Sequence, residues 1–167
     1  MKANILVAVL LLFCLGCTSQ QSDQLTLQQK DQIKSELKVI SDSVMARFQR
    51  LDTDGAMQYY WDSPDFIAFN PDGSRSDFQT MKKEHVDLFS SSASLRILIT
   101  REDFMVLSKD IAIAALVLKA EVALKSGDKM VFDPDAVTLV FEKIAGQWKA
   151  IRSHESGTIV TQKAGKK

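Results

Sequence analysis

Apolar and polar positions alternate with a helical period in the first half of the chain and with a strand period in the second half. In the longest helical pattern, apolar residues recur at steps of three and four, which places them on one stripe. This stripe consists of Ile33, Leu37, Ile40, Val44, Phe48 and Leu51. From Ser94 onward the period is two, as in half-buried strands. The pattern predicts an α+β domain in which helices lie across a sheet.

Two shorter helices are predicted after the first. Asp52-Thr53-Asp54 offers N-cap chemistry for a short helix that runs through Trp61. Ser76 begins a Ser-Asp-Phe-Gln sequence with the spacing of a capping box, and we expect Ser76 to be the cap of the third helix. His85 lies on the apolar stripe of that helix. Between these helices we expect a short strand and a turn at Asn70-Pro71-Asp72-Gly73.

Four long strands with short turns are predicted to form an antiparallel meander. Their expected ranges are 94–107, 111–125, 130–143 and 147–157. We expect a bulge near Glu102-Asp103 in the first of them. Pro134 interrupts the third strand and predicts a bulge or an unpaired edge.

The last hairpin decides which side chains face inward, and two registers are open. A three-residue loop with Gly146 in the left-handed conformation pairs Lys143 with Gln147, whereas a two-residue loop exchanges the faces. We favour the first register. It places one set of residues inward: Val137, Leu139, Phe141, Ile151, Ser153 and Glu155. It places the other set outward: Thr138, Val140, Trp148, Ala150, Arg152 and His154.

The N-terminus differs from the rest of the chain. Lys2 precedes an apolar run that is too short to span a bilayer and is typical of a signal peptide. Leu15-Gly16-Cys17-Thr18-Ser19 resembles a bacterial lipobox, although Cys14 stands where that motif usually has leucine. The resemblance implies a signal peptide over 1–16, a lipid on Cys17 and a tether over 17–24. An ordinary secretory peptide is the alternative, and residues 159–167 are expected to be a flexible basic tail.

Most of the chain also resembles a known family. Its order of three helices, a short strand and a meander, with Gly146-Gln147-Trp148-Lys149 and His154-Glu155-Ser156 near its end, is similar to the SnoaL-like branch of the nuclear-transport-factor-2-like (NTF2-like) superfamily. The resemblance covers residues 25–158. It implies a cone, in which three N-terminal helices pack on a strongly curved antiparallel sheet around a pocket. Members include isomerases, cyclases, binding modules and oligomerisation domains, so the fold alone does not determine function.

Glu155 and His85 are the candidate catalytic residues. Burial at the mouth of an apolar cone would raise the pKa of Glu155 and make it a general base or a hydrogen-bond acceptor. A solvated carboxylate at a strand end is the alternative for Glu155, and a hydrogen-bonded core histidine is the alternative for His85. The candidate ligand-binding residues are Tyr59, Tyr60, Trp61, Phe66, Phe69, Leu139, Ile151 and Ser153. Thr138, Trp148 and His154 form a candidate dimer face.

These observations favour a membrane-tethered domain that binds a small, mostly apolar molecule. An acid–base isomerase or hydrolyase resembling ketosteroid isomerase is the alternative, and a dimerisation module is a third hypothesis. Neither a cofactor nor a metal is expected, because no Gly-rich phosphate loop is present and the two histidines lack neighbours at ligand spacing. The balance of 21 basic and 21 acidic residues gives no indication of nucleic-acid binding. We expect a homodimer in the bacterial cell envelope, anchored by its lipid and, from Thr18, at the outer membrane facing the periplasm.

Overall fold

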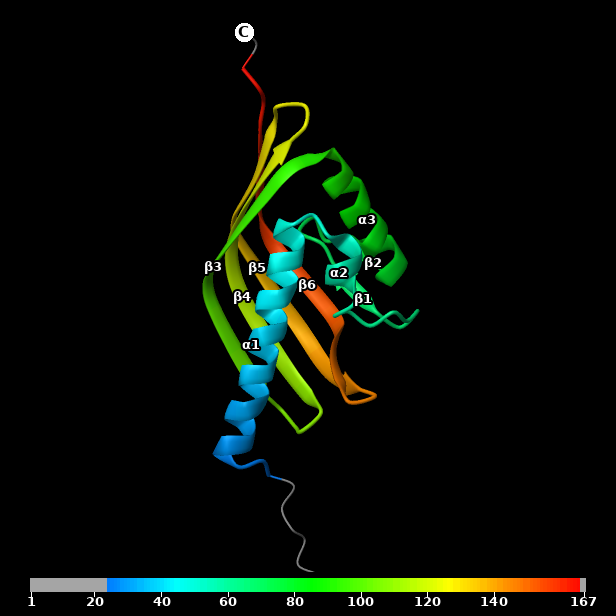
Figure 1. Cartoon of the computed structure of the whole chain (residues 1–167), viewed down its shortest axis with the longest axis vertical. Helices are drawn as coiled ribbons and strands as arrows, with labels where there is room; N and C mark the ends of the chain where they lie inside the picture. Colours follow the sequence, from blue (N-terminus) through cyan, green and yellow to red (C-terminus); the bar gives the residue numbers. More distant parts are fainter. Residues whose placement is uncertain (1–23, 166–167) are drawn as a thin grey trace, which may run out of the picture.

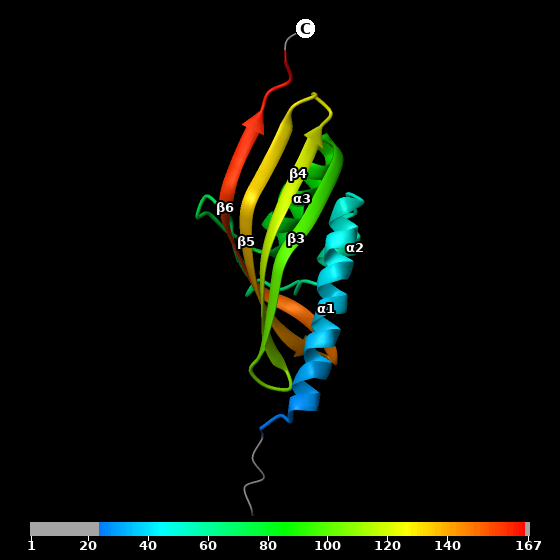
Figure 2. The same ribbon diagram turned by 90° about the vertical axis from the view of Figure 1, so that its left-hand side faces the viewer.

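Three helices lie on one face of a curved six-stranded sheet in a computed structural model that describes residues 24–165 (Figure 1). The helices are α1 (Leu27–Gln49), α2 (Thr53–Met57) and α3 (Phe78–Ser91). The strands are β1 (Ile67–Phe69), β2 (Arg75–Ser76), β3 (Ser92–Val106), β4 (Ile111–Leu124), β5 (Lys129–Ile144) and β6 (Gln147–Gln162). Their order across the sheet is β2-β1-β6-β5-β4-β3, and the view turned by 90° shows α1 running along the strands (Figure 2).

Most of the predicted stripe is the buried face of α1, although Ile40 is only partly buried and Leu51 lies just after the end of the helix. A capping box begins this helix, since the Thr26 hydroxyl accepts from the Gln29 backbone and the Gln29 side chain accepts from the Thr26 backbone. Leu37, fully buried, and Phe48 pack into the core that the helix shares with the sheet. Together with Ile33, Val44 and Met45 these side chains fix α1 against the sheet by burying apolar area.

The caps of the two shorter helices confirm one prediction and correct another. Asp52, within the predicted cap sequence Asp52-Thr53-Asp54, caps α2 and accepts from the Gly55 backbone at 2.9 Å, but the helix ends at Met57, before its predicted end at Trp61. The cap of α3 is Asp77, whose carboxylate accepts from the Thr80 backbone, and not Ser76. Ser76 belongs to β2 instead, where its hydroxyl is buried and bonds to Glu84. Because Ser76 pairs with Ala68 of β1, the helix begins one residue later, after Asp77, a residue type that caps a helix as well as serine does.

The short strands attach to β6 from the side opposite the meander. β1 runs parallel to β6, with Ala68 opposite Ser153, and antiparallel to β2. The predicted turn between them is confirmed, because the Gly73 amide donates to the Asn70 carbonyl at 2.9 Å and Gly73 has a φ of 81°. This turn places Asn70 beside the end of β6 that carries the candidate site.

The four-strand meander is confirmed, with its bulges partly displaced. β3 has two irregularities, one between Ser92 and Ser94 at its start and one between Ile99 and Arg101, just before the predicted position. The irregularity at Pro134 is as predicted: the β5–β6 register shifts between Phe132 and Asp135. β6 continues to Gln162, beyond its predicted end at residue 157.

The last hairpin has the two-residue loop, so the favoured register is wrong near the turn. Ile144 pairs with Gln147, and both loop residues, Ala145 and Gly146, have positive φ. Trp148 and Ala150 are therefore buried, opposite Lys143 and Phe141, and do not face outward.

A bulge at Ile151 then returns the following residues of β6 to the faces that the favoured register gave them. The register shifts between Val140 and Phe141, which leaves Ile151 without a partner on β5. Beyond it, Leu139 pairs with Ser153 and Val137 with Glu155. All four of these side chains line one cavity. The predicted inward residues are thus confirmed except for Ile151, although the loop that was to place them inward was wrong.

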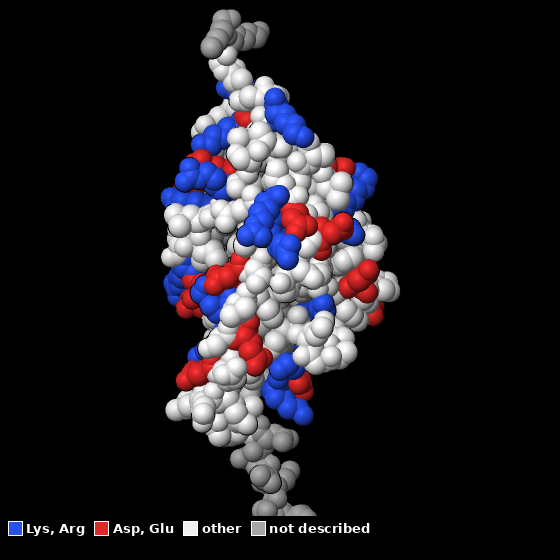
Figure 3. Space-filling view, viewed as in Figure 1, with Lys and Arg blue, Asp and Glu red and all other residues white. Residues whose placement is uncertain are grey.

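Charged side chains of both signs are interspersed over the face seen in Figure 3. Most pair locally, as Lys83 does with Asp87 and Lys119 with Asp133. Exposed pairs of this kind add little stability. In residues 24–165, no helix combines the length and the hydropathy needed to cross a membrane.

Candidate functional site

A cavity of about 250 Å³ lies between α1, α3 and the concave face of the sheet. Its wall is mostly apolar and aromatic, with contributions from Met45, Phe48, Met81, Phe89, Phe132 and Leu139. A few polar side chains interrupt this wall, namely Tyr60, Asn70, Glu84, His85, Asp135, Ser153 and Glu155. An apolar cavity with a few convergent polar groups is the usual form of a small-molecule site.

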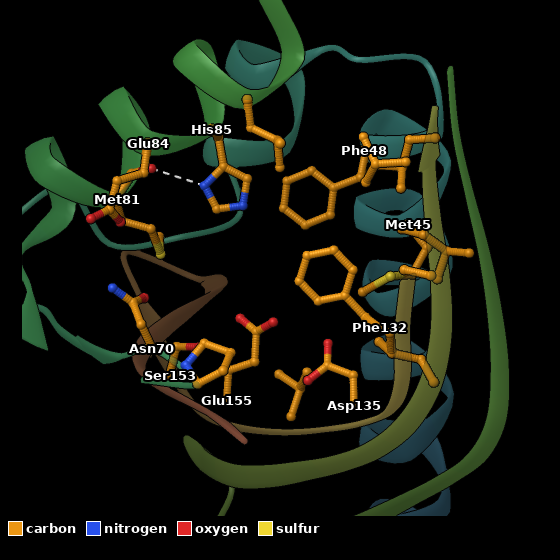
Figure 4. Close-up of a pocket in the computed structure, with 18 of the residues that line it drawn as sticks. Met45, Phe48, Asn70, Met81, Glu84, His85, Phe132, Asp135, Ser153 and Glu155 are labelled. Carbon is orange, nitrogen blue, oxygen red and sulfur yellow. Dashed lines mark hydrogen bonds between the residues drawn. The ribbon is translucent and has the colours of Figure 1, made fainter. Parts of the chain in front are cut away.

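Two carboxyl groups point into the cavity from neighbouring strands (Figure 4). Glu155 lies on β6 and Asp135 on β5, just after the bulge at Pro134. Asp135 is paired with Gly157, where a Cβ would lie 3.0 Å from the Asp135 Oδ1 atom and 2.6 Å from the Pro134 carbonyl oxygen. A glycine at 157 is therefore required for the close approach of the two strands beside Asp135.

The carboxyl pair retains a proton at neutral pH. Burial raises the pKa of Glu155 to about 8, and the charge of Asp135 and the hydrogen bond to it act in the same direction. Burial also raises the pKa of Asp135, and its hydrogen bond with Glu155 partly opposes this. Two carboxylates this close do not both ionise readily, so the pair holds one proton, mainly on Glu155. The raised pKa that the sequence predicted for Glu155 is thus found, and at neutral pH its carboxyl group can donate a proton, whereas its role as a general base or hydrogen-bond acceptor stays a prediction.

Asp135 carries a polar atom without a partner. Its side chain is only 4% exposed, and its Oδ1 atom has no hydrogen bond in the described part of the chain. Buried carboxyl oxygens in this state are uncommon, because leaving them unsatisfied costs free energy.

His85 lies across the cavity from the two carboxyl groups (Figure 4). Its Nδ1–H donates to the Met81 carbonyl at 2.8 Å, its ring stacks on Phe48 with centroids 5.0 Å apart, and Phe89 meets it edge-on. Burial lowers the pKa of His85, although the bond to Met81 and the charge of Glu84 partly oppose this. A neutral His85 with its proton on Nδ1 leaves Nε2 as an acceptor, so His85 is a candidate base.

Tyr60 contributes a hydroxyl that stays protonated. Two backbone hydrogen bonds between its neighbours and Ala150 fix its position, one donated by Trp61 and one accepted by Tyr59. Burial and the charge of Glu155 both raise its pKa. Tyr60 is 9% exposed and lines the cavity.

The β1–β2 turn and α3 form one side of the site through a polar chain. Asn70 Nδ2 donates to the Ser76 hydroxyl at 3.0 Å, and that hydroxyl donates to the Glu84 carboxylate at 3.1 Å. Asn70 also donates to Ser74, so its two N–H donors are engaged and its carbonyl oxygen remains an acceptor.

The structure separates the predicted ligand-binding residues into two groups. Tyr60, Leu139 and Ser153 line the cavity, as do the candidate catalytic residues Glu155 and His85. The others lie outside its wall: Tyr59, Trp61, Phe66, Phe69 and Ile151. Phe66 is fully buried in the core, whereas Phe69 is 44% exposed and contacts the His154 ring.

The predicted dimer face is divided by the bulge at Ile151. Thr138 and His154 are exposed cross-strand neighbours on the outer surface of the sheet. Trp148 is buried on the opposite face, where its indole Nε1–H donates to Glu36 at 2.9 Å, so its predicted exposed position is wrong. Dimerisation through Thr138 and His154 stays a prediction.

Asp135 is the main residue that sequence reasoning missed. Pro134 was interpreted as a bulge or an unpaired edge and the neighbouring acidic residues were not considered, yet an acidic residue inside an otherwise apolar strand is itself a signal. Asn70 and Glu84 are brought to the cavity by the short β1–β2 pair and by α3. In residues 24–165, no group of three or more His, Cys, Asp or Glu side chains is arranged to hold a metal ion.

No family model and no curated protein matches the sequence of this chain. Solved structures do match its fold. A proposed scytalone dehydratase from Novosphingobium aromaticivorans superposes with a TM-score of 0.72 at 10% identity, covering 85% of this chain and 94% of that one. An NTF2-like superfamily protein from Salmonella enterica superposes with a TM-score of 0.69 at 14% identity, covering 77% and 92%. The chain has the NTF2-like fold.

A third match is a hexachlorocyclohexane dehydrochlorinase, with a TM-score of 0.65 at 10% identity over 83% of this chain and 94% of that one. The fold class predicted from the sequence is confirmed by these matches. At such low identity they establish the NTF2-like fold, and the function must be argued from the cavity.

Proposed function

We propose that this NTF2-like domain binds a small, mostly apolar molecule in the cavity and acts on it by acid–base elimination or isomerisation. One observation carries the proposal: a protonated Glu155 and a neutral His85 face each other across an apolar space. An acid and a base with pKa values near the working pH are the requirement for this type of catalysis.

In an elimination, His85 Nε2 would take a proton from a substrate carbon. The electron pair of that C–H bond forms a C=C bond while the C–O bond of the neighbouring carbon breaks. Glu155 gives its proton to the departing oxygen, which leaves as water, and Tyr60 can donate a hydrogen bond to an oxygen of the substrate. A proton then passes from His85 to Glu155 through solvent, which restores both groups. An isomerisation uses the same two groups but returns the proton to a different carbon of the substrate.

Two of the matched structures have names that denote elimination, a dehydratase and a dehydrochlorinase. Their names support the reaction class, while the identity of about 10% leaves the substrate open. Binding without turnover is the second candidate function, because the apolar wall of the cavity would hold a ligand whether or not a reaction follows.

The proposal is tested by incubating the protein with a panel of cyclic β-hydroxy ketones and measuring loss of water by mass spectrometry. Glu155→Gln and His85→Gln should each lower turnover at least 100-fold, since removal of a general acid or base typically has this effect. Glu142→Gln, on β5 but outside the cavity wall, is the matched control. Turnover that survives both cavity substitutions would refute acid–base catalysis by this pair, and binding without turnover would leave only the binding function.

We also propose that Cys17 carries a lipid that anchors the domain at a bacterial membrane, at the outer membrane facing the periplasm. Cys17 lies outside the described residues, so this proposal rests on the lipobox-like sequence. Cys17→Ser should move the protein from the membrane fraction to the soluble fraction. Unchanged membrane fractionation would refute lipidation.

A further inference from the structure

The cavity wall has negative but no positive charge. Its acidic residues are Glu84, Asp135 and Glu155, and within residues 24–165 no Lys or Arg lines it. Its remaining titratable groups are His85, which burial keeps neutral, and Tyr60, which burial keeps protonated. An anionic ligand would find no counter-charge in this cavity, while its own charge would lose hydration.

A ligand that donates hydrogen bonds is favoured by the unpartnered oxygen of Asp135. This atom is buried, lines the cavity and has no hydrogen bond in the described structure. A donor on the ligand would satisfy it and remove the cost of the buried, unpaired acceptor. His85 Nε2 and the Asn70 carbonyl oxygen are two further acceptors on the same wall.

The charge of the carboxyl pair favours a cationic donor over a neutral one. With one shared proton, Asp135 and Glu155 together carry one negative charge on a mostly apolar wall. An ammonium group neutralises this charge, and charge-assisted hydrogen bonds are about twice as strong as neutral ones. The aromatic side chains of Phe48 and Phe132 on the same wall offer additional cation–π stabilisation (Figure 4).

We propose that the ligands of this cavity are small amphipathic amines, with the ammonium group at Asp135 and Glu155 and the apolar part against the aromatic wall. The proposal rests on the proposed function only in taking the cavity as the ligand site. It names a ligand class: an amine with an apolar ring or chain that fits a cavity of about 250 Å³. A carboxylate or phosphate ligand is excluded by the same reasoning.

Three probes of matched shape test the inference: cyclohexylamine, cyclohexanol and cyclohexanecarboxylate, each titrated into the wild-type protein in a calorimeter at pH 7.5. We expect cyclohexylamine to bind at least tenfold more tightly than cyclohexanol, and cyclohexanecarboxylate to bind most weakly. Binding of the amine should strengthen between pH 7 and 9, because the carboxyl pair loses its shared proton while an alkylamine with a pKa of about 10.4 keeps its charge.

Asp135→Asn should weaken amine binding at least tenfold and leave binding of the alcohol within about twofold, because the amide keeps the shape but loses the charge. Asp133→Asn is the matched control, since Asp133 lies two residues away on β5, is exposed and pairs with Lys119. Circular dichroism and thermal melting check that both variants fold. The comparison of the three probes on the wild-type protein tests the inference even if Asp135→Asn does not fold.

The outcomes separate this inference from the proposed function. Equal affinity for cyclohexylamine and cyclohexanol, or unchanged amine binding by a folded Asp135→Asn protein, would overturn the amine assignment and leave acid–base catalysis standing. Tighter binding of the carboxylate would do the same. If none of the three probes binds, both the amine assignment and the cavity as a small-molecule site are overturned.

Discussion

Glu36 and Glu155 lie toward opposite ends of the same core and have pKa values shifted in opposite directions. The Trp148 indole N–H, Gln32 and Lys143 donate to Glu36, and these bonds lower its pKa. Glu155 faces an apolar space and another carboxyl group, which raise its pKa to about 8. We call the end at Glu36 the closed end, because its carboxylate has hydrogen-bond partners. We call the end at Glu155 the open end, because it borders the cavity and leaves the Asp135 Oδ1 atom without a partner.

The difference shows how one strand pair builds both a core and a site. Between the hairpin turn and Ile151, β5 and β6 bury Phe141, Trp148 and Ala150 against the helices. Beyond the Ile151 bulge the same strands place Ser153 and Glu155 into the cavity. We expect changes at the closed end to affect stability and changes at the open end to affect binding and catalysis.

The largest predicted effect compares two phenylalanines on β5. Phe141 is 2% exposed in the closed core, and Phe141→Ala should lower the free energy of unfolding by about 3–5 kcal/mol. Phe132 is partly exposed and borders the cavity, so Phe132→Ala should lower it by only about 1 kcal/mol, because it enlarges an existing space. Urea unfolding at pH 7 measures both values.

This comparison fails if the two substitutions cost the same free energy. Equal losses would mean that the cavity end is packed as tightly as the closed end. Phe132→Leu serves as a control. Leucine fills more of the space left by phenylalanine than alanine does, so this substitution should lower the free energy of unfolding by even less than Phe132→Ala.

Most of the fold could be predicted from the sequence because it follows from period and capping. The stripe on α1, the Asp52 cap and the meander all follow from local patterns. Ser76 was mistaken for the cap of α3 because Asp77, the next residue, caps a helix equally well by type. Local patterns do not choose between adjacent residues of equal propensity.

The site was predictable only in part, because it depends on registers that the sequence leaves open. Ser153 and Glu155 face the cavity only because a bulge at Ile151 offsets the two-residue turn. No residue type marks that bulge, since isoleucine is an ordinary strand residue. Asp135 was missed because its burial depends on its cross-strand neighbour Gly157 and on the helices above the sheet.

The second prediction concerns the pH dependence of stability. Glu155 has a raised pKa, so the stability that its proton provides is complete below the unfolded pKa of 4.5 and is lost as pH rises through about 8. His85 acts in the opposite direction, but only below its unfolded pKa of 6.5. Between pH 6.5 and 8 the free energy of unfolding should therefore fall by about 1–2 kcal/mol, measured by urea unfolding.

Glu155→Gln provides the control for this window, since glutamine does not titrate. Its free energy of unfolding should stay level between pH 6.5 and 8 and should exceed that of the wild type at the upper limit. A wild-type protein with no decline in this range would contradict the protonated state of the carboxyl pair.

The smallest predicted effect tests whether the closed end depends on the bond between Glu36 and Trp148. Glu36→Ala removes the acceptor and leaves the indole N–H of Trp148, a residue 5% exposed, without its partner, so the free energy of unfolding should fall by about 1 kcal/mol. Glu36→Gln keeps an acceptor oxygen and should cost about half as much. Of the two indole N–H signals in a ¹H–¹⁵N spectrum, that of Trp148 should move in both variants while that of Trp61 stays in place.

The pH dependence of this cost provides a second check. Because the pKa of Glu36 is lowered, the stability that its carboxylate provides is present above pH 4.5 and is lost as pH falls through the folded pKa. A cost for Glu36→Ala that persists unchanged at low pH would show that the closed end is stabilised by packing alone.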